Sequence, residues 1–175
     1  MMQQSDLEQR RAMEVRFNGR TLHGYVAKFD SETQIGRYRE IISPGAFRSS
    51  LKENSDIIAL ADHDPAQILG RTSSGTLELR EDDVGLAFSL KVPNTSKGND
   101  LIELAQRNDL GGMSFGFRVK KGGDKWKDDL RTLTDVELFE VSVVSSWPAY
   151  GETKVSLRSK PPRIYFLESN WLDTV

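Results

Sequence analysis

The alternation of apolar and polar residues along the chain predicts a protein built mostly from β-strands. In "TLHGYVAKFD" (21–30) the side chains separate into two alternating sets, which is the two-residue period of a strand. The run "DIIALADH" (56–63) is short and apolar and fits a buried strand that ends at a polar tip. The acidic residues 81–83 predict a turn between two neighbouring strands. The expected strands are 21–30, 36–43, 56–63, 75–82, 84–92, 109–119 and 131–144.

Two stretches carry helical signals. In "SPGAFRSSLKE" (43–53) Ser43 can cap a helix, and Pro44 suits the first helical position because its missing N–H would be unpaired there. "SKGNDLIELAQRND" (96–109) has an apolar helical stripe, with Gly111 after it as a stop. A Gly-, Lys- and Asp-rich hairpin loop is expected near 120–129. These elements predict a mainly β (α+β) fold, a closed β-barrel of about six to eight strands with a few helices packed around it.

Length and composition restrict the class of protein. The 175 residues suit one domain with a single core, and 37% hydrophobic with 29% charged residues is a globular composition. A formal net charge of −2 gives no electrostatic case for nucleic acid. No apolar stretch approaches the ~20 residues that cross a bilayer, and the start lacks the apolar core of a signal peptide. We therefore expect a cytoplasmic protein without nucleic-acid or membrane partners.

The chain divides into three parts by sequence. We expect a flexible N-terminal segment (1–13), a folded domain (14–160) and, after a diproline, a C-terminal tail (161–175) that docks or is detached. Because cysteine is absent, disulfides, thiolate metal sites and cysteine nucleophiles are excluded. The acidic residues Asp62, Asp64 and 81–83 lack the spacing of a calcium loop, and no phosphate-cradling glycine motif occurs. No cofactor and no metal are expected.

Ser114 is the first candidate for chemistry. In "MSFGFRV" (113–119) strand parity places Phe115 and Phe117 on one face and Ser114 and Gly116 on the other. Ser114 therefore points away from the apolar stripe, and Gly116 leaves room for a backbone to come close. This suits a nucleophile over which an extended peptide is laid. It equally suits a structural serine beside a crowded neighbour, and a serine needs a base within ~2.6–3.2 Å to react.

The sequence has two histidines, so any histidine base must be His23 or His63. His63, in "ADHDP", stands at the end of a buried run and before a proline turn, where a side chain can be held rigidly yet reach solvent. The alternative is a surface turn in which His63 pairs with a neighbouring carboxylate. His23 lies inside a strand pattern and is expected to be a packing residue.

Glu140 is the candidate acid. In the long strand 131–144 it shares a face with Val136, Leu138 and Ser142, so its carboxylate is expected to be partly buried and to need a partner. A histidine that becomes charged during a reaction is one such partner, and a structural arginine is the other. Ser142 is the reserve candidate for a polar role in the site.

Five segments in order resemble the tailed-phage prohead protease family, which comprises capsid-maturation serine proteases related in fold to herpesvirus assemblin. They cover roughly residues 15 to 155 and read "ISPGAF", "ADHDPAQILGRT", "DDVGLAFSLKVPNTSKGNDLIEL", "GGMSFGFRV" and "ELFEVSVVSSWPAY". The resemblance implies a herpesvirus-protease-like barrel with Ser114 as nucleophile and His63 as base. The third role would fall on Glu140, because no histidine follows His63. It further implies an oxyanion-binding loop at 145–150, and Arg71 is a candidate to hold a water or a carboxylate near the site.

The resemblance also implies a biological role. The protein would be a serine endopeptidase in the host cytoplasm, inside the assembling prohead. It would cleave scaffold protein or the scaffolding segment of the major capsid protein. Self-association is left open. The tail 161–175 is a candidate for self-cleavage. The alternatives are a catalytically silent capsid-assembly or scaffold-binding module on the same barrel, and a barrel that binds a small ligand.

Overall fold

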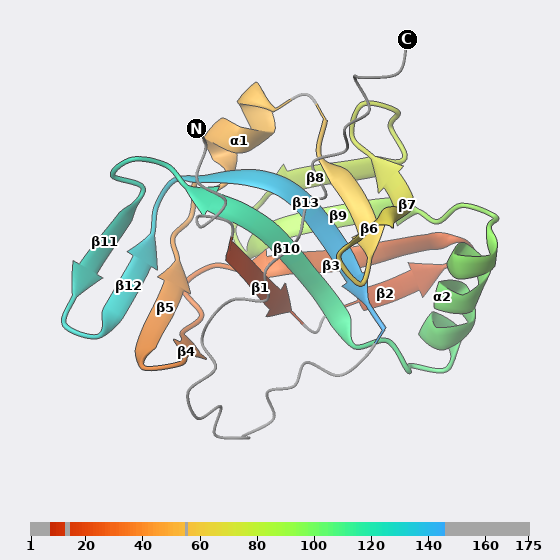
Figure 1. Ribbon diagram of the computed structural model, residues 1–175, viewed down its shortest axis with the longest axis horizontal. Helices are drawn as coiled ribbons and strands as arrows, with labels where there is room; N and C mark the ends of the chain where they lie inside the picture. The colour runs from red at the N-terminus through yellow and green to blue at the C-terminus, as the bar shows by residue number, and fades with distance from the viewer. Residues whose placement is uncertain (1–7, 13–14, 55, 146–175) are drawn as a thin grey trace, which may run out of the picture.

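Three separate β-sheets form most of the structure. The computed structural model describes residues 8–12, 15–54 and 56–145. The five-stranded sheet has the order β1-β10-β13-β6-β7 and crosses the middle of the molecule (Figure 1). Its neighbours are antiparallel except for β13 and β6, which run parallel. Its strands are β1 (Glu8–Ala12), β10 (Gly112–Val119), β13 (Val136–Val144), β6 (Ile58–Ala61) and β7 (Asp64–Arg71).

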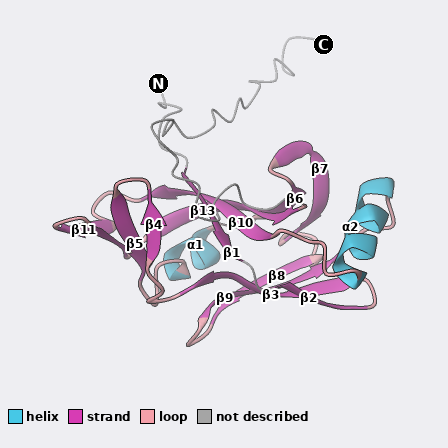
Figure 2. Ribbon diagram, turned by 90° about the horizontal axis from the view of Figure 1, so that it is seen from below, coloured by secondary structure: helices cyan, strands magenta, loops and turns pink. Residues whose placement is uncertain are grey.

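The other two sheets have four strands each. The sheet β2-β3-β9-β8 lies as a second layer below the five-stranded sheet in Figure 2. The sheet β11-β12-β5-β4 stands at one end of the molecule, and helix α2 (Ser96–Gln106) stands at the other (Figure 2). Helix α1 (Arg48–Glu53) packs against β13 and β8. The strands are β2 (Val15–Asn18), β3 (Thr21–Lys28), β9 (Gly85–Lys91), β8 (Leu77–Glu81), β11 (Asp124–Lys127), β12 (Leu130–Leu133), β5 (Tyr38–Ile42) and β4 (Thr33–Ile35).

The core of the molecule includes a cluster of phenylalanines. Phe115 and Phe117 point from β10 into the core, and their rings stack with centroids 5.2 Å apart. Phe47, which precedes α1, meets Phe115 edge-on at 5.6 Å. The alternation in the sequence had placed Phe115 and Phe117 on the apolar face of this strand, and both are buried. Since this face is fixed by burial, the opposite face of β10 carries Ser114 and Gly116.

The predicted closed barrel is wrong, although the mainly β content is as expected. Each sheet keeps two edge strands, and among the described residues no hydrogen-bonded ladder joins an edge of one sheet to an edge of another. Local alternation predicts where strands occur, but closure depends on which distant strands pair. Here β12 pairs with β5 and β13 pairs with β6, both in parallel and across long stretches of chain.

The expected strand 131–144 is two strands in different sheets. The chain breaks between β12 and β13, where the amides of Thr134 and Asp135 both donate to the carbonyl of Gly123. The predicted loop 120–129 contains β11, which pairs with β12. Strand β7 was not expected because it contains Pro65. It is an edge strand, where a missing N–H is tolerated.

The helices are shorter than the sequence predicts. Helix α1 begins at Arg48, not at Pro44, because Gly45 has a φ of 92°, which a right-handed helix cannot contain. Helix α2 ends at Gln106, and Asn108, with a φ of 58°, terminates the turn before Gly111 is reached.

At the N-terminus, residues 8–12 of the expected flexible segment form β1, which pairs with β10. The tail 161–175 lies outside the described residues.

Candidate active site

The pairing of β10 with β13 places four small or polar residues on one face of the five-stranded sheet. Ser114 lies opposite Ser142, and Gly116 lies opposite Glu140. Ser114 and Ser142 are fully buried, and Glu140 is 7% exposed. The site face, as we call it, is therefore defined by Ser114, Gly116, Glu140 and Ser142.

A bulge in β13 separates this face from the core. The register changes between Gly116, which pairs with Glu140, and Phe117, which pairs with Leu138. Phe139 is the extra residue, so Leu138 turns toward the core with Phe117 while Glu140 stays on the site face. The expectation that Leu138 and Glu140 share a face is therefore wrong. A strict two-residue period cannot show a bulge.

His63 reaches this face from the turn between β6 and β7. Asp62 and His63 have φ values of 52° and 61°, as a two-residue type I′ turn requires, and Ala61 pairs with Asp64 across it. Aspartate and histidine are among the residues that tolerate this left-handed conformation best. The turn places Nδ1 of His63 2.8 Å from Oε1 of Glu140. Both side chains are largely buried, with 13% and 9% of their surface exposed.

The Glu140 carboxylate is held on both oxygens. Oε1 faces Nδ1 of His63, and Oε2 accepts a hydrogen bond of 2.6 Å from Oγ of Ser142. An ionised carboxylate only accepts, so in a neutral imidazole Nδ1 of His63 would donate to Oε1 and Nε2 would have the free lone pair. A Cβ atom at Gly116 would stand 2.6 Å from Oε1, so this glycine makes room for the carboxylate. From the sequence, Gly116 was expected to leave space for the backbone of a bound peptide instead.

Two buried polar atoms, one on the site face and one on His63, have no partner among the described residues. Oγ of Ser114 and Nε2 of His63 have no hydrogen bond with any described residue, and each is almost inaccessible to solvent. Buried polar groups are nearly always hydrogen-bonded, so exceptions require an explanation. The hydroxyl can donate, and Nε2 would accept in a neutral imidazole that has its proton on Nδ1, but the two atoms are not hydrogen-bonded to each other in this structure. Their roles are complementary, as a nucleophile and its base require.

Three residues to which the sequence analysis gave no such role, Asp62, Ser145 and Lys97, support the His63 turn. The Asp62 carboxylate accepts hydrogen bonds from the amide of Ser145, from its hydroxyl and from the Lys97 ammonium. Partial burial opposes ionisation of Asp62, but these hydrogen bonds outweigh it and lower the pKa of the carboxyl below its usual value. In the sequence, Asp62 stands directly before His63 at an expected turn. This position marks Asp62 as a turn residue, but it does not show that Ser145 and Lys97 bind its carboxylate.

Other sequence candidates lie elsewhere. Arg71 does bind a carboxylate, that of Asp56 at 3.0 Å, but at the opposite end of the β6–β7 hairpin from His63. His23 is half-buried in β3, in another sheet. Among the described residues no group of acidic or histidine side chains could hold a metal, and no helix is long and apolar enough to cross a membrane. Of the expected oxyanion loop 145–150, only Ser145 is described.

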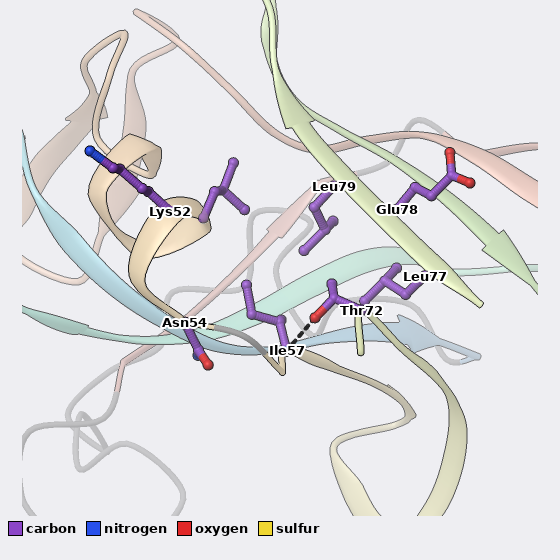
Figure 3. A pocket seen from close by; sticks show the side chains of 8 residues that line it. Lys52, Asn54, Ile57, Thr72, Leu77, Glu78 and Leu79 are labelled. Carbon is purple, nitrogen blue, oxygen red and sulfur yellow. Dashed lines mark hydrogen bonds between the residues drawn. The ribbon is translucent and has the colours of Figure 1, made fainter. Parts of the chain in front are cut away.

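A surface groove of about 380 Å³ lies between α1 and β8 (Figure 3). Leu51, Ile57, Leu77 and Leu79 provide its apolar wall, and the amide of Ile57 donates to the hydroxyl of Thr72 within it. None of the site-face residues line this groove. It is therefore separate from the Glu140–His63 pair.

Comparison with known proteins identifies the family. Residues 6–162 match the family model described as Caudovirus prohead serine protease. The chain belongs to this family. The prohead protease also has a fold similar to that in "Structure of the bacteriophage T4 capsid assembly protease, gp21", with a TM-score of 0.58 and 10% identity. That match covers 82% of this chain and 98% of the T4 chain, and at this identity it shows the fold alone. No curated protein matches the sequence.

The family match confirms the resemblance stated from the sequence. The coarse function follows from it: a serine protease of phage capsid maturation that acts in the assembling prohead. The site face is the part of this prohead protease where a buried serine, a histidine and a carboxylate come together. Its residue roles are considered next.

Proposed function

We propose that the protein is a serine endopeptidase with Ser114 as nucleophile, His63 as general base and Glu140 as the acid that orients His63. One observation carries the proposal: Glu140 binds Nδ1 of His63 at 2.8 Å, while Nε2 and the Ser114 hydroxyl are left buried and unpaired. A structural arginine for Glu140 was the rival interpretation. The contacts of Glu140 at the site are His63 and Ser142 instead.

The proposed reaction follows from these roles. Nε2 of His63 takes the proton of Ser114 as Oγ attacks the carbonyl carbon of the scissile peptide bond. The imidazolium that forms is stabilised by Glu140 and then protonates the leaving amine as the C–N bond breaks. A water, deprotonated by His63, hydrolyses the acyl-enzyme and restores Ser114. Because both reacting atoms are enclosed in this structure, the site must open to admit a peptide.

Ser142 has a supporting role in this proposal. Its hydroxyl donates to Oε2 of Glu140 and so fixes the orientation of the carboxylate. Glu140 in turn holds His63, and the nucleophile in the proposed roles is Ser114. Ser142 is therefore a positioning residue.

The proposed substrates are scaffold protein or the scaffolding segment of the major capsid protein. The family supports this class, because its members are prohead proteases. The tail 161–175 is a further candidate substrate in the same chain. Its removal would appear as a mass loss of the protease itself.

The test is co-expression of the protease with the major capsid protein and scaffold protein of its phage, followed by intact-mass analysis. The variants are Ser114→Ala and a control, Ser73→Ala, in an exposed serine bound to Asp56. We expect wild type and Ser73→Ala to remove a defined segment and Ser114→Ala to leave every chain intact. Equal cleavage by Ser114→Ala would refute the nucleophile. Assembly of shells without cleavage by wild type would favour the silent assembly module.

A further inference from the structure

The turn that carries His63 is unfavourable in isolation. Two consecutive residues other than glycine hold positive φ values there, 52° at Asp62 and 61° at His63. Such conformations are unfavourable for residues other than glycine, and they persist only where the surroundings hold them. The position of Nδ1 opposite Glu140 therefore depends on what holds this turn.

Asp62 provides that support through both its backbone and its side chain. Its amide donates to the carbonyl of Val143 at 2.9 Å, which extends the contact of β6 with β13 by one residue. Its Oδ1 accepts the Ser145 amide at 2.8 Å, and its Oδ2 accepts the Ser145 hydroxyl at 2.6 Å. The ammonium of Lys97 binds Oδ2 at 3.0 Å. One carboxylate thus ties the His63 turn to the end of β13 and to the first turn of α2.

A left-handed turn alone does not explain these contacts. Asparagine tolerates positive φ as well as aspartate does, so the backbone does not require a carboxylate at position 62. The next acid, Asp64, is exposed like Asp62 but shows what an ordinary turn aspartate does: among the described residues its Oδ1 accepts from the nearby amide of Ala66, at 2.9 Å. The Asp62 carboxylate, in contrast, binds Ser145 and Lys97, which are distant in sequence.

We propose that the Asp62 carboxylate is a positioning residue of the protease: it locks the 62–63 turn to Ser145 and Lys97, and so holds Nδ1 of His63 on Glu140. The expected effect of Asp62 on catalysis rests on the proposed function. Its structural part, the orientation of the His63 ring, can be measured without any catalysis.

The test combines kinetics with NMR of the histidine side chains. The protein has two histidines, so a sample labelled with ¹⁵N in the imidazole ring gives two sets of signals, and His23→Gln assigns them. The spectra are recorded on the full chain with Ser114→Ala, so that no self-cleavage occurs. In this parent we expect the ring of His63 to be protonated at Nδ1, with a hydrogen-bonded Nδ1–H signal.

The key variant is Asp62→Asn, which keeps the preference for the turn but removes the charge and one acceptor. We expect His63 to lose the single Nδ1–H form. In the Ser114-containing chain kcat is expected to fall about 10- to 100-fold, with KM changed less than about threefold, because the base is misplaced. Lys97→Met is expected to give a smaller loss of kcat, and Lys97→Arg to restore most of it. Asp64→Asn is the matched control and is expected to stay within about twofold of wild type.

The outcomes separate the two levels of the proposal. A folded Asp62→Asn variant that keeps both the Nδ1–H signal and kcat would overturn the role of Asp62. Loss of kcat with an unchanged His63 signal would also overturn it, because Asp62 would then act by another route. If the wild-type chain cleaves nothing, the proposed function fails, yet loss of the Nδ1–H form in Asp62→Asn would still support the positioning role.

Discussion

Gly116→Ala is expected to damage the site by moving one carboxylate while leaving the fold intact. A Cβ atom at this position would stand 2.6 Å from Oε1, 3.1 Å from Cγ and 3.2 Å from Cδ of Glu140. Ordinary contacts begin near 3.4 Å, so the oxygen must move by about 0.8 Å. The backbone of Gly116 does not have a positive φ, so alanine brings no backbone strain of its own.

The carboxylate has little freedom to move because both oxygens are bound. Oε1 is 2.8 Å from Nδ1 of His63, and Oε2 is 2.6 Å from Oγ of Ser142. A shift of this size stretches or breaks one bond, and misplacement by about 1 Å can cost about 100-fold in rate. We expect kcat to fall about 10- to 100-fold. Overpacking costs about 1–3 kcal/mol, partly offset by the lower entropy of an unfolded chain with alanine.

The assay is the rate of capsid or scaffold cleavage, followed by intact mass, together with thermal unfolding. A net loss of about 1–2 kcal/mol corresponds to a Tm lower by roughly 3–6 °C. The control is Gly75→Ala, at a φ of 67° with nothing within 4 Å, which costs backbone strain alone. It is expected to lower Tm by a similar amount and to keep its activity. Wild-type activity in a folded Gly116→Ala variant would refute the reasoning about Glu140.

Three further predictions concern single side chains. Ser142→Ala removes the donor to Oε2 of Glu140, and we expect about 1–3 kcal/mol lower stability in urea unfolding and about tenfold slower cleavage; unchanged stability and rate would contradict this. Arg131→Met removes the guanidinium that binds carboxylates on β1, β5 and β11, and it should destabilise by about 3–5 kcal/mol, measured by urea unfolding; a loss below about 1 kcal/mol would contradict it. Hydrogen bonds, led by the one from the Val84 amide, lower the pKa of Asp82 below its ordinary value of 3.8. The contribution of ionised Asp82 to the free energy of unfolding is therefore present above pH 3.8 and lost as the pH falls below it. Asp82→Asn should make the free energy of unfolding, measured against pH, fall less steeply in this acidic range.

The site was predictable to the extent that it depends on local periodicity. Alternation in β10 put Ser114 on the face opposite Phe115 and Phe117, and that is where the structure has it. The cost of burying an unpaired charge predicted that Glu140 has a partner, either a histidine or an arginine, and the structure has His63 there. The end of a short apolar run indicated that His63 stands at a turn, which the structure also shows.

What the sequence did not predict depends on irregular or distant contacts. The bulge at Phe139 moves Leu138 off the face of Glu140, and no two-residue pattern contains it. The barrel was predicted from the number of strands, but the three sheets arise from long-range pairings such as that of β13 with β6. The link from Asp62 to Ser145 joins residues far apart in the chain, so composition and spacing near His63 gave no sign of it.

The most direct test of the central claim is covalent labelling with a fluorophosphonate, followed by peptide mass spectrometry. The Ser114 oxygen would bond to phosphorus and displace fluoride, with His63 taking the hydroxyl proton. We predict one adduct, on Ser114, formed by wild type and at least about 100-fold more slowly by His63→Gln. An adduct on Ser142 or another serine, or equal labelling rates in the two proteins, would contradict the Ser114–His63–Glu140 site.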